Sequence, residues 1–357
     1  MTREDLYRYT GSLQQIAYAR RIRYDEGRAR GLEAVEVKNG PLRFVILLDK
    51  CMDIGELSWR GDQVNFLSKP GLNGRNPFDT NGAEAQRSIM GGLFFTCGYE
   101  NICAPYTDRA GKTYPMHGRM RTSPAEHVSI QAGWKDGTYT VSVSGDIREA
   151  ELFGENLLLH RTIETRLGIP TVRVTDRVYN EGFREEPFLL MYHCNMGFPF
   201  LTERARLILP TVEVTPRDPV SAENALRWDT MDPPKDNESE YVYLHRLAAD
   251  LNGNTFAALV DDTLARGVYL GFNRNRLPEF GQWKSTASGD YVMGLEPGNA
   301  KVYGRAYHER EGTLPVLAPG AETEISLQFT MLEGMEIITS LEEKSNLLRK
   351  KEKESMP

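Results

Sequence analysis

The sequence predicts an all-β protein, built as a large antiparallel β-sandwich with few short helices. Between Gly31 and Gly334, short runs rich in Val, Ile, Phe, Tyr and Thr follow one another, separated by Gly, Asn, Asp and Pro. No helical pattern of about 10–15 residues comes between these runs, as a doubly wound sheet would require. With 40% hydrophobic and 26% charged residues, the chain can also build a core.

The chain divides into three predicted parts. Residues 1–30 form an N-terminal extension, in which irregularly spaced apolar residues from Leu6 to Arg30 indicate a short helix. Residues 31–336 form the β-sandwich, which carries the candidate functional residues. Residues 337–357 form a polar C-terminal tail, whose basic run after Leu348 predicts a frayed helix end.

Turn signals within the sandwich predict its hairpins. Asn39-Gly40 lies between two strand runs and indicates a type I′ turn, because that turn requires positive φ at both central residues. Asp136-Gly137 lies between alternating runs in the same way. Residues 65–86 are rich in Gly, Asn and Pro and predict a long surface loop, which at that length is often a lid or a rim.

Charge and composition limit the classes of partner. A net charge of -7 and a pI near 5.6 argue against nucleic acid, which is bound by clustered Lys and Arg. No apolar run approaches ~18 residues and the first twenty residues have no apolar core, so we expect no membrane partner and no signal peptide. The four cysteines form no CxxC pair, which favours reduced thiols and a cytoplasmic location. We expect a monomer or homodimer that binds a small molecule.

Histidine is the usual side chain for proton transfer near neutral pH, so its positions are informative. His117 lies in YPMHGRMR, a polar and tightly turned stretch, where a plain loop histidine is an equal alternative. His193 lies in FLLMYHCNMGFPF, where a satisfied core histidine is the alternative to a functional one. The remaining four lie in ordinary alternating or charged sequence, which favours surface or structural roles: His127, His160, His245 and His308.

Glu296 is the candidate carboxylate partner. It lies in VMGLEPGNA, where it ends an apolar strand run before a Pro-Gly-Asn turn. Partial burial there would raise its pKa toward a value useful to a general base, whereas a solvated glutamate at a strand end is the alternative. With His117, His193 and Cys194 it could in principle bind zinc, but the short paired spacing of metal motifs is missing, so we expect no metal. No GxSxG, GxGxxG or Walker motif occurs.

The run VRVTDRVYNEGFREEPFLLMYHCNMGFPF resembles the aldose 1-epimerase segment in which a strand and an Asn turn lead to a histidine and a nearby asparagine. The order His117-Gly118, His193 and Glu296 matches that family, and the resemblance spans about residues 31–334. The runs LLDKCMDIGELSWRGDQVNFLS and MGGLFFTCGYENICAP, with Trp283-Lys284, are similar to a divergent, DUF4432-type branch of the galactose mutarotase-like superfamily.

The resemblance implies a carbohydrate epimerase or mutarotase that interconverts the anomers of an aldose or acidic sugar derivative. Glu296 would take the proton of the anomeric hydroxyl, His193 would donate to the ring oxygen, and His117 would hydrogen-bond near it. No cofactor is required, because the hemiacetal supplies both electrophile and leaving group. The alternatives are a carbohydrate-binding protein without turnover and a sugar isomerase acting in the same pocket.

Several polar residues are candidates for substrate binding. Arg119 and Arg121 could bind hydroxyls or an anionic substituent, or form salt bridges with neighbouring acids. Trp283 could stack on a sugar face or belong to the core, and Lys284 could bind a hydroxyl or an acid group. The remaining rim candidates are Asn195, Asp53, Asp49, Glu100 and Asn101.

Overall fold

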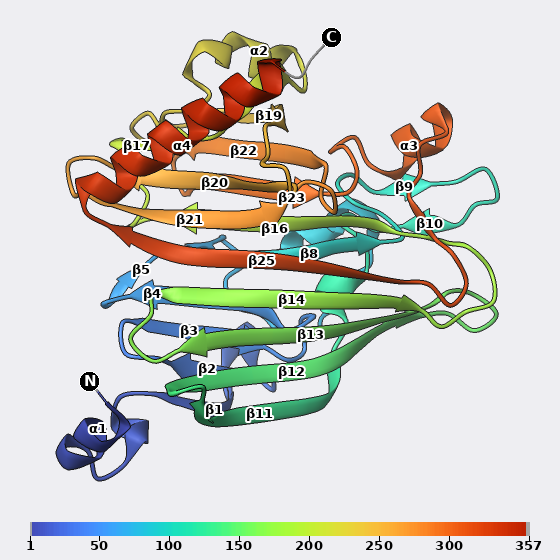
Figure 1. The fold of residues 1–357 in the computed structure, drawn as a ribbon. Helices are drawn as coiled ribbons and strands as arrows, with labels where there is room; N and C mark the ends of the chain where they lie inside the picture. Colours follow the sequence, from blue (N-terminus) through green and yellow to red (C-terminus); the bar gives the residue numbers. More distant parts are fainter. Residues whose placement is uncertain (1, 355–357) are drawn as a thin grey trace.

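A computed structural model describes residues 2–354 and contains three main antiparallel sheets (Figure 1). The N-terminal sheet has five strands in sequence order: β1 (Tyr18–Arg23), β2 (Glu33–Lys38), β3 (Leu42–Leu47), β4 (Asp53–Trp59) and β5 (Asp62–Gln63). The predicted all-β fold class is confirmed.

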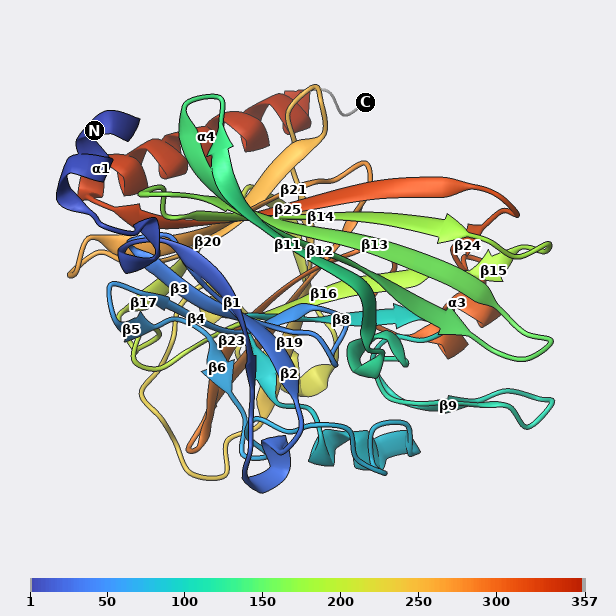
Figure 2. The ribbon, with the colours of Figure 1, turned by 90° about the horizontal axis from the view of Figure 1, so that it is seen from below.

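The largest sheet has eight strands and forms one layer of the sandwich. In spatial order they are β11 (Ala125–Lys135), β12 (Thr138–Ala150), β13 (Asn156–Arg166), β14 (Thr171–Asn180), β25 (Glu322–Glu333), β21 (Arg266–Asn273), β20 (Asn254–Asp261) and β17 (Ala205–Ile208). Figure 2 shows six of its strands, β11 to β14, β25 and β21, on one side of β1 and β4 of the N-terminal sheet.

A six-stranded sheet contributes, with the N-terminal sheet, to the second layer. Its spatial order is β18 (Thr211–Pro216), β19 (Glu240–Leu247), β22 (Glu279–Ala287), β23 (Asp290–Gly298), β16 (Leu189–Gly197) and β8 (Phe94–Tyr99). Three short pairs complete the strands: β6 (Phe66–Leu67) with β7 (Gly91–Gly92), β9 (Tyr106–Thr107) with β10 (Thr113–Tyr114), and β15 (Glu186–Pro187) with β24 (Val316–Leu317).

One hydrophobic core joins the layers. Phe44 of β3, Tyr192 of β16 and Met293 of β23 belong to the same buried cluster as Ile163 of β13 and Phe329 of β25. Because successive strand residues point to opposite faces, the neighbours of Tyr192 and Met293 point away from this core. The six-stranded sheet therefore has a second face on which polar groups can gather.

The predicted hairpins form, with one difference in turn type. Asp136 and Gly137 both have positive φ, 48° and 75°, and join β11 to β12 as a two-residue turn. Between β2 and β3 only Gly40 has positive φ, because the connection is three residues long and ends in Pro41. The amide of Leu42 donates there to the side chain of Asn39.

The helices are short apart from the last one. They are α1 (Arg3–Tyr9), α2 (Pro219–Glu223), α3 (Arg305–Glu311) and α4 (Met335–Glu354), with 3₁₀ turns at Leu13–Gln15, Gly27–Ala29, Gly82–Arg87, Met120–Thr122 and Ala225–Arg227. The helix predicted between Leu6 and Arg30 is thus confined mainly to α1, and β1 extends the sheet into this segment.

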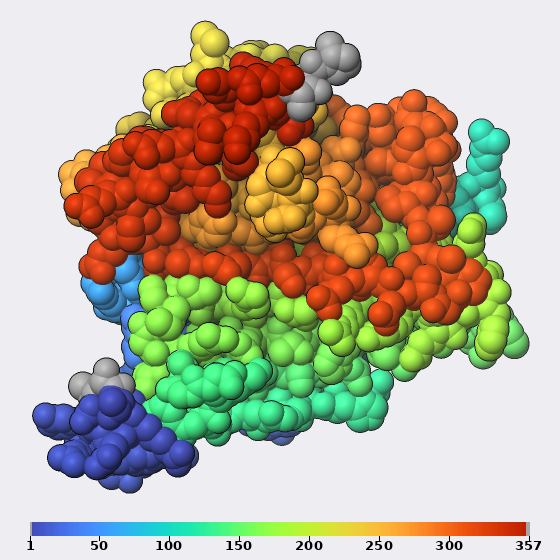
Figure 3. Space-filling model, in the orientation of Figure 1, coloured from blue at the N-terminus to red at the C-terminus, as the bar shows by residue number. Residues whose placement is uncertain are grey.

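The C-terminal segment is a helix that lies against the sandwich. Ile338 and Leu348 of α4 are buried in a cluster with Phe256 of β20. Figure 3 shows α4 running from the left side of the molecule to the top, while α1 projects at the lower left. No helix within residues 2–354 has the length and apolar character needed to cross a membrane.

Candidate active site

The candidate residues meet on the face of the six-stranded sheet that points away from the sandwich core. Met191, His193 and Asn195 alternate along β16 with Tyr192 and Cys194, which belong to the core cluster. The period-2 alternation of a strand therefore places His193 and Asn195 on one side and their neighbours on the other.

Strand register brings Glu296 next to His193. Cys194 pairs with Leu295 and Met191 with Gly298, so His193 lies opposite Glu296 across β16 and β23. On the other side of β16, His193 pairs with Phe95 of β8. The Nε2 atom of His193 lies 3.1 Å from Oε1 of Glu296, so two residues far apart in sequence form one acid–base pair.

Glycines make room for the carboxylate of Glu296. Gly281 of β22 pairs with Glu296, and a Cβ there would lie 3.0 Å from Oε2. A Cβ at Gly294 would lie 3.0 Å from Oε1 and 2.9 Å from Cβ of Trp283. Larger residues at either position would push the carboxylate or the indole out of place.

Glu296 is buried and incompletely satisfied. It is 4% exposed, and its Oε1 has no hydrogen-bond partner among residues 2–354. Burial raises the pKa of this carboxyl, and the neighbouring His193 opposes that rise. A buried carboxylate oxygen without a donor is costly, which makes it a natural point of contact for a ligand hydroxyl.

His193 is fixed in position and in tautomer. Its Nδ1 lies 2.6 Å from Oδ1 of Asn195, whose amide nitrogen donates to the carbonyls of His193 and Gly92 at 2.8 and 3.3 Å. Oδ1 is therefore the acceptor, and Nδ1 of His193 carries a hydrogen. The imidazole also stacks on Phe95, with ring centroids 4.6 Å apart. Its Nε2 is left to face Glu296.

His117 comes from the loop after β10 and meets the pair from the side. Its ring centroid lies 5.5 Å from those of His193 and Phe95. Its Nδ1 accepts a hydrogen bond from the backbone amide of Cys103 at 3.3 Å, and burial lowers its pKa well below the ordinary range. His117 is therefore neutral with its hydrogen on Nε2.

The backbone around His117 is tightly constrained. His117 has φ of 59° and Gly118 has φ of 71°, and a Cβ at Gly118 would lie 2.3 Å from the carbonyl oxygen of Gly98. Only glycine fits at this second position, so the His-Gly pair noted in the sequence has a steric reason.

These groups line a pocket of about 630 Å³, within the range of about 300–1,000 Å³ typical of small-molecule sites. Trp283 borders it and donates from Nε1 to Glu240 at 2.8 Å, and Glu240 also accepts from Arg217 at 3.3 Å. The predicted surface loop forms part of the pocket wall, through Phe66, Ser68, Lys69, Pro70 and Gln86.

The other predicted binding residues lie elsewhere. Lys284 is fully buried on the opposite face of β22 from Trp283 and donates to the carbonyl of Arg227 at 2.8 Å. Arg119 pairs with Glu100 outside this pocket. Because neighbouring residues on a strand face opposite sides, Trp283 and Lys284 could not both line one pocket.

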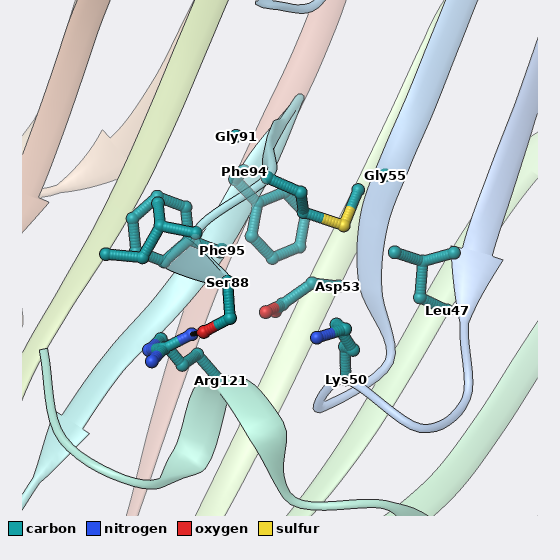
Figure 4. Close-up of a pocket in the computed structure, with 11 residues that line it drawn as sticks. Leu47, Lys50, Asp53, Gly55, Ser88, Gly91, Phe94, Phe95 and Arg121 are labelled. Atoms are coloured by element: carbon teal, nitrogen blue, oxygen red, sulfur yellow. Dashed lines mark hydrogen bonds between the residues drawn. The ribbon is translucent and has the colours of Figure 1, made fainter. Parts of the chain in front are cut away.

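Asp53 and Arg121 line a separate cavity of about 20 Å³, large enough for a single water molecule (Figure 4). Figure 4 shows both side chains pointing toward this cavity beside Lys50. Asp53 accepts hydrogen bonds from Thr96 and from Arg161 at 2.7 Å, which makes it part of a buried ionic network.

Sequence reasoning missed Phe95, Arg217, Glu240 and Lys69, which also line the pocket. Phe95 lies within an apolar run, and the others are ordinary charged residues, so no local signal distinguishes them. Within residues 2–354 no cluster of three or more His, Cys, Asp or Glu is arranged to hold a metal ion.

Solved structures of other proteins share this fold. A candidate aldose 1-epimerase from Klebsiella pneumoniae superimposes with a TM-score of 0.87 at 22% identity, covering 94% of this chain and 92% of that one. A galactose mutarotase-like protein from Clostridium acetobutylicum gives 0.57 at 14% identity, covering 89% and 99%, and galactose 1-epimerase from Lactobacillus acidophilus gives 0.57 at 12% over the same shares.

The sequence has no significant match among curated proteins. A family model for a domain of unknown function, DUF4432, matches residues 29–331, which is most of the chain and includes every strand from β2 to β24. At identities below 25% the solved structures establish a shared fold, whereas the family model matches the sequence itself. The chain therefore belongs to the DUF4432 family and has the fold of the galactose mutarotase-like proteins.

Proposed function

We propose that the protein is a carbohydrate epimerase of the mutarotase type, which interconverts the anomers of an aldose by acid–base catalysis. The observation that supports this most is the buried Oε1 of Glu296, which has no donor among residues 2–354 and lies 3.1 Å from Nε2 of His193 beside a sugar-sized pocket. A sugar hydroxyl would supply the missing donor. Asn195 and Trp283 are the predicted binding residues that remain in this proposal.

The hydrogen-bond pattern suggests the starting protonation state. Nδ1 of His193 bonds Asn195 through its hydrogen, so donation from Nε2 requires a second hydrogen, and the proposed starting state is an imidazolium beside the Glu296 carboxylate. The carboxylate accepts the proton of the anomeric hydroxyl while His193 donates its Nε2 proton to the ring oxygen. The bond between the anomeric carbon and the ring oxygen breaks, and an open-chain aldehyde forms.

Ring closure reverses these transfers. After rotation about the bond next to the aldehyde, the sugar hydroxyl attacks the other face and returns its proton to His193, while Glu296 returns its proton to the new anomeric oxygen. The proton count is conserved, so the pair is reset after each turnover. The neutral His117 donates from Nε2 to a sugar oxygen and orients the ring.

Anomer exchange in a panel of aldoses, followed by NMR or polarimetry, tests this function. We expect rates above the spontaneous reaction for at least one sugar, and loss of that acceleration in Glu296→Gln. Acceleration that is equal in the parent and the variant across the panel would refute the proposal. Sugar binding without turnover would identify a binding protein, and a product of changed constitution would identify an isomerase.

A further inference from the structure

A second hollow adjoins the candidate active site. It has a volume of about 410 Å³ and is lined by Arg28, Lys69, Pro70, Phe78, Gln86 and Arg87. Lys69, Pro70 and Gln86 line both this hollow and the pocket that contains Glu296. The two spaces therefore lie next to each other and share three lining residues.

The second hollow is basic. Three of its lining residues are cationic and none is acidic. Arg28 donates to the backbone carbonyls of Arg87 and Pro70 at 3.0 and 3.4 Å, and no carboxylate of residues 2–354 lies within 4.0 Å of its guanidinium. Arg87 has a loose contact of 3.8 Å with the exposed Glu84. Both guanidinium groups thus keep donors and most of their charge available.

The pocket around Glu296 has the opposite character. Its Arg217 is held by Asp218 at 2.9 Å and by Glu240 at 3.3 Å, and Lys69 is held by Asp290 at 2.6 Å. These cations are already paired with carboxylates. An anionic group would be repelled by Glu296 and attracted toward Arg28 and Arg87.

The hollow is assembled from two separate segments. Arg28 lies in the 3₁₀ turn Gly27–Ala29, and the other lining residues belong to residues 69–87 (Figure 2). The amide of Gly74 donates to the carbonyl of Arg28 at 2.8 Å, which holds the loop against this turn. Two arginines from separate segments, Arg28 and Arg87, thus line one hollow, and guanidinium groups suit an anion with several oxygens.

Resting on the proposed function, we propose that the substrate is an aldose with an anionic substituent remote from the anomeric carbon, and that Arg28 and Arg87 bind that substituent. Carboxylate, sulfonate and phosphate groups share the required chemistry. Glu296 then acts on the uncharged anomeric end, while the charged end lies in the basic hollow. Charge separation along the ligand fixes its orientation, because the reversed pose would bring the anion to Glu296.

Calorimetry on the Glu296→Gln protein tests this inference without turnover. The probes are D-glucose and D-galactose, their 6-phosphates and their uronates, each at low and high salt. We expect the charged sugars to bind more tightly than the neutral ones, and Arg87→Ala to weaken charged-sugar binding about 10-fold at low salt with little change for neutral sugars. Added salt should reduce the difference.

Two further variants separate recognition from loop structure. Arg75→Ala removes an exposed cation from the same loop that does not line the hollow, so both classes of sugar should bind as before. Arg28→Lys keeps a charge but loses the planar fork, and should weaken charged-sugar binding selectively. Equal weakening of neutral and charged sugars by Arg87→Ala would overturn the inference, as would no preference for charged sugars in the parent.

Rates distinguish this inference from the proposed function. Equally efficient anomer exchange of neutral and charged sugars would refute anion recognition and support the mutarotase proposal. Arg87-dependent binding of charged sugars without acceleration of any would support the anion site and refute the mutarotase proposal.

Discussion

Replacing Glu296 with Gln keeps the shape of the side chain and removes the base, so it separates catalysis from packing. The carboxylate faces His193 at 3.1 Å, and an amide cannot accept the proton of the anomeric hydroxyl. Loss of a general base typically costs about 10²–10⁴ in rate, which corresponds to about 3–5 kcal/mol of transition-state stabilisation. We expect kcat/KM to fall by this factor.

The same change should stabilise the folded protein above mildly acidic pH. The pKa of Glu296 is raised above its ordinary value of 4.5 because the side chain is 4% exposed. A carboxyl with a raised folded-state pKa stabilises the fold fully below pH 4.5, and this stabilisation is lost as the pH rises through the folded-state pKa. The loss is about 1.4 kcal/mol for each pH unit by which the pKa is raised, or roughly 2 °C in Tm for a chain of this length.

Anomer exchange by NMR and urea unfolding at pH 4 and pH 8 measure both effects. Glu149→Gln is a matched control, because Glu149 is also 4% exposed and burial raises its pKa to about 8, yet it lies outside the pocket and accepts hydrogen bonds from the backbone of Tyr99 and Glu100. The control should keep its activity. A Glu296→Gln protein that is fully active, or that is inactive only because it is less stable at pH 8, would refute the reasoning.

Substitutions at three other positions test the surrounding geometry. His117→Asn keeps an acceptor for the backbone amide of Cys103, which donates to Nδ1 of His117, but it removes the Nε2 donor. We therefore expect kcat to fall about 100-fold. Because the pKa of His117 is lowered by burial, the wild type should lose stability as the pH falls below 6.5, and urea titrations should show a smaller loss in this variant. Gly294→Ala places a methyl group 3.0 Å from Oε1 of Glu296 and should lower kcat at least about 10-fold, with a folded protein by circular dichroism. Asn195→Leu removes the acceptor of the Nδ1 hydrogen of His193, so kcat should fall and its pH profile should shift. Asn195→Asp places a carboxylate at the same position, which favours the protonated imidazole, so the limb of the pH profile that reports His193 should move to higher pH. Activity profiles that match the wild type in all four variants would contradict the assigned arrangement.

Local patterns in the sequence were sufficient to predict the all-β fold class, but not β1, which lies in the segment expected to be helical. The turn at Asp136-Gly137 has the predicted dihedral angles, because a two-residue hairpin admits few backbone conformations. The turn at Asn39-Gly40 differs because Pro41 lengthens the connection between the strands to three residues. Turn type depends on the length of the whole connection and not on two residues alone.

The candidate site depended on information that alternation alone does not contain. A period of two shows that Trp283 and Lys284 point to opposite faces, but it does not show which face carries the pocket. Arg121 lies in the 3₁₀ turn Met120–Thr122, where strand alternation does not apply, and it donates to the backbone carbonyl of Asp79 at 2.6 Å inside the protein. Choosing the face requires knowing which side of the sheet packs on the eight-stranded layer, and that is a property of the assembled sandwich.

Strand register explains why no local sequence motif marks the pair formed by His193 and Glu296. Phe95, His193, Glu296 and Gly281 are successive neighbours across β8, β16, β23 and β22, so they form one row perpendicular to the strands. None of these four residues belongs to a local sequence motif, because each strand contributes a single residue to the row. The glycines around Glu296 are a local signal of the site. Gly294 lies two residues before this glutamate on the same strand, and Gly281 lies on the preceding strand. Because glycine has no side chain, these positions leave a hollow on a sheet face that side chains would normally cover. A buried carboxylate next to glycines lowers the stability of the folded protein, because few contacts offset its desolvation. The glutamate and the glycines together therefore indicate a ligand site more strongly than the glutamate alone.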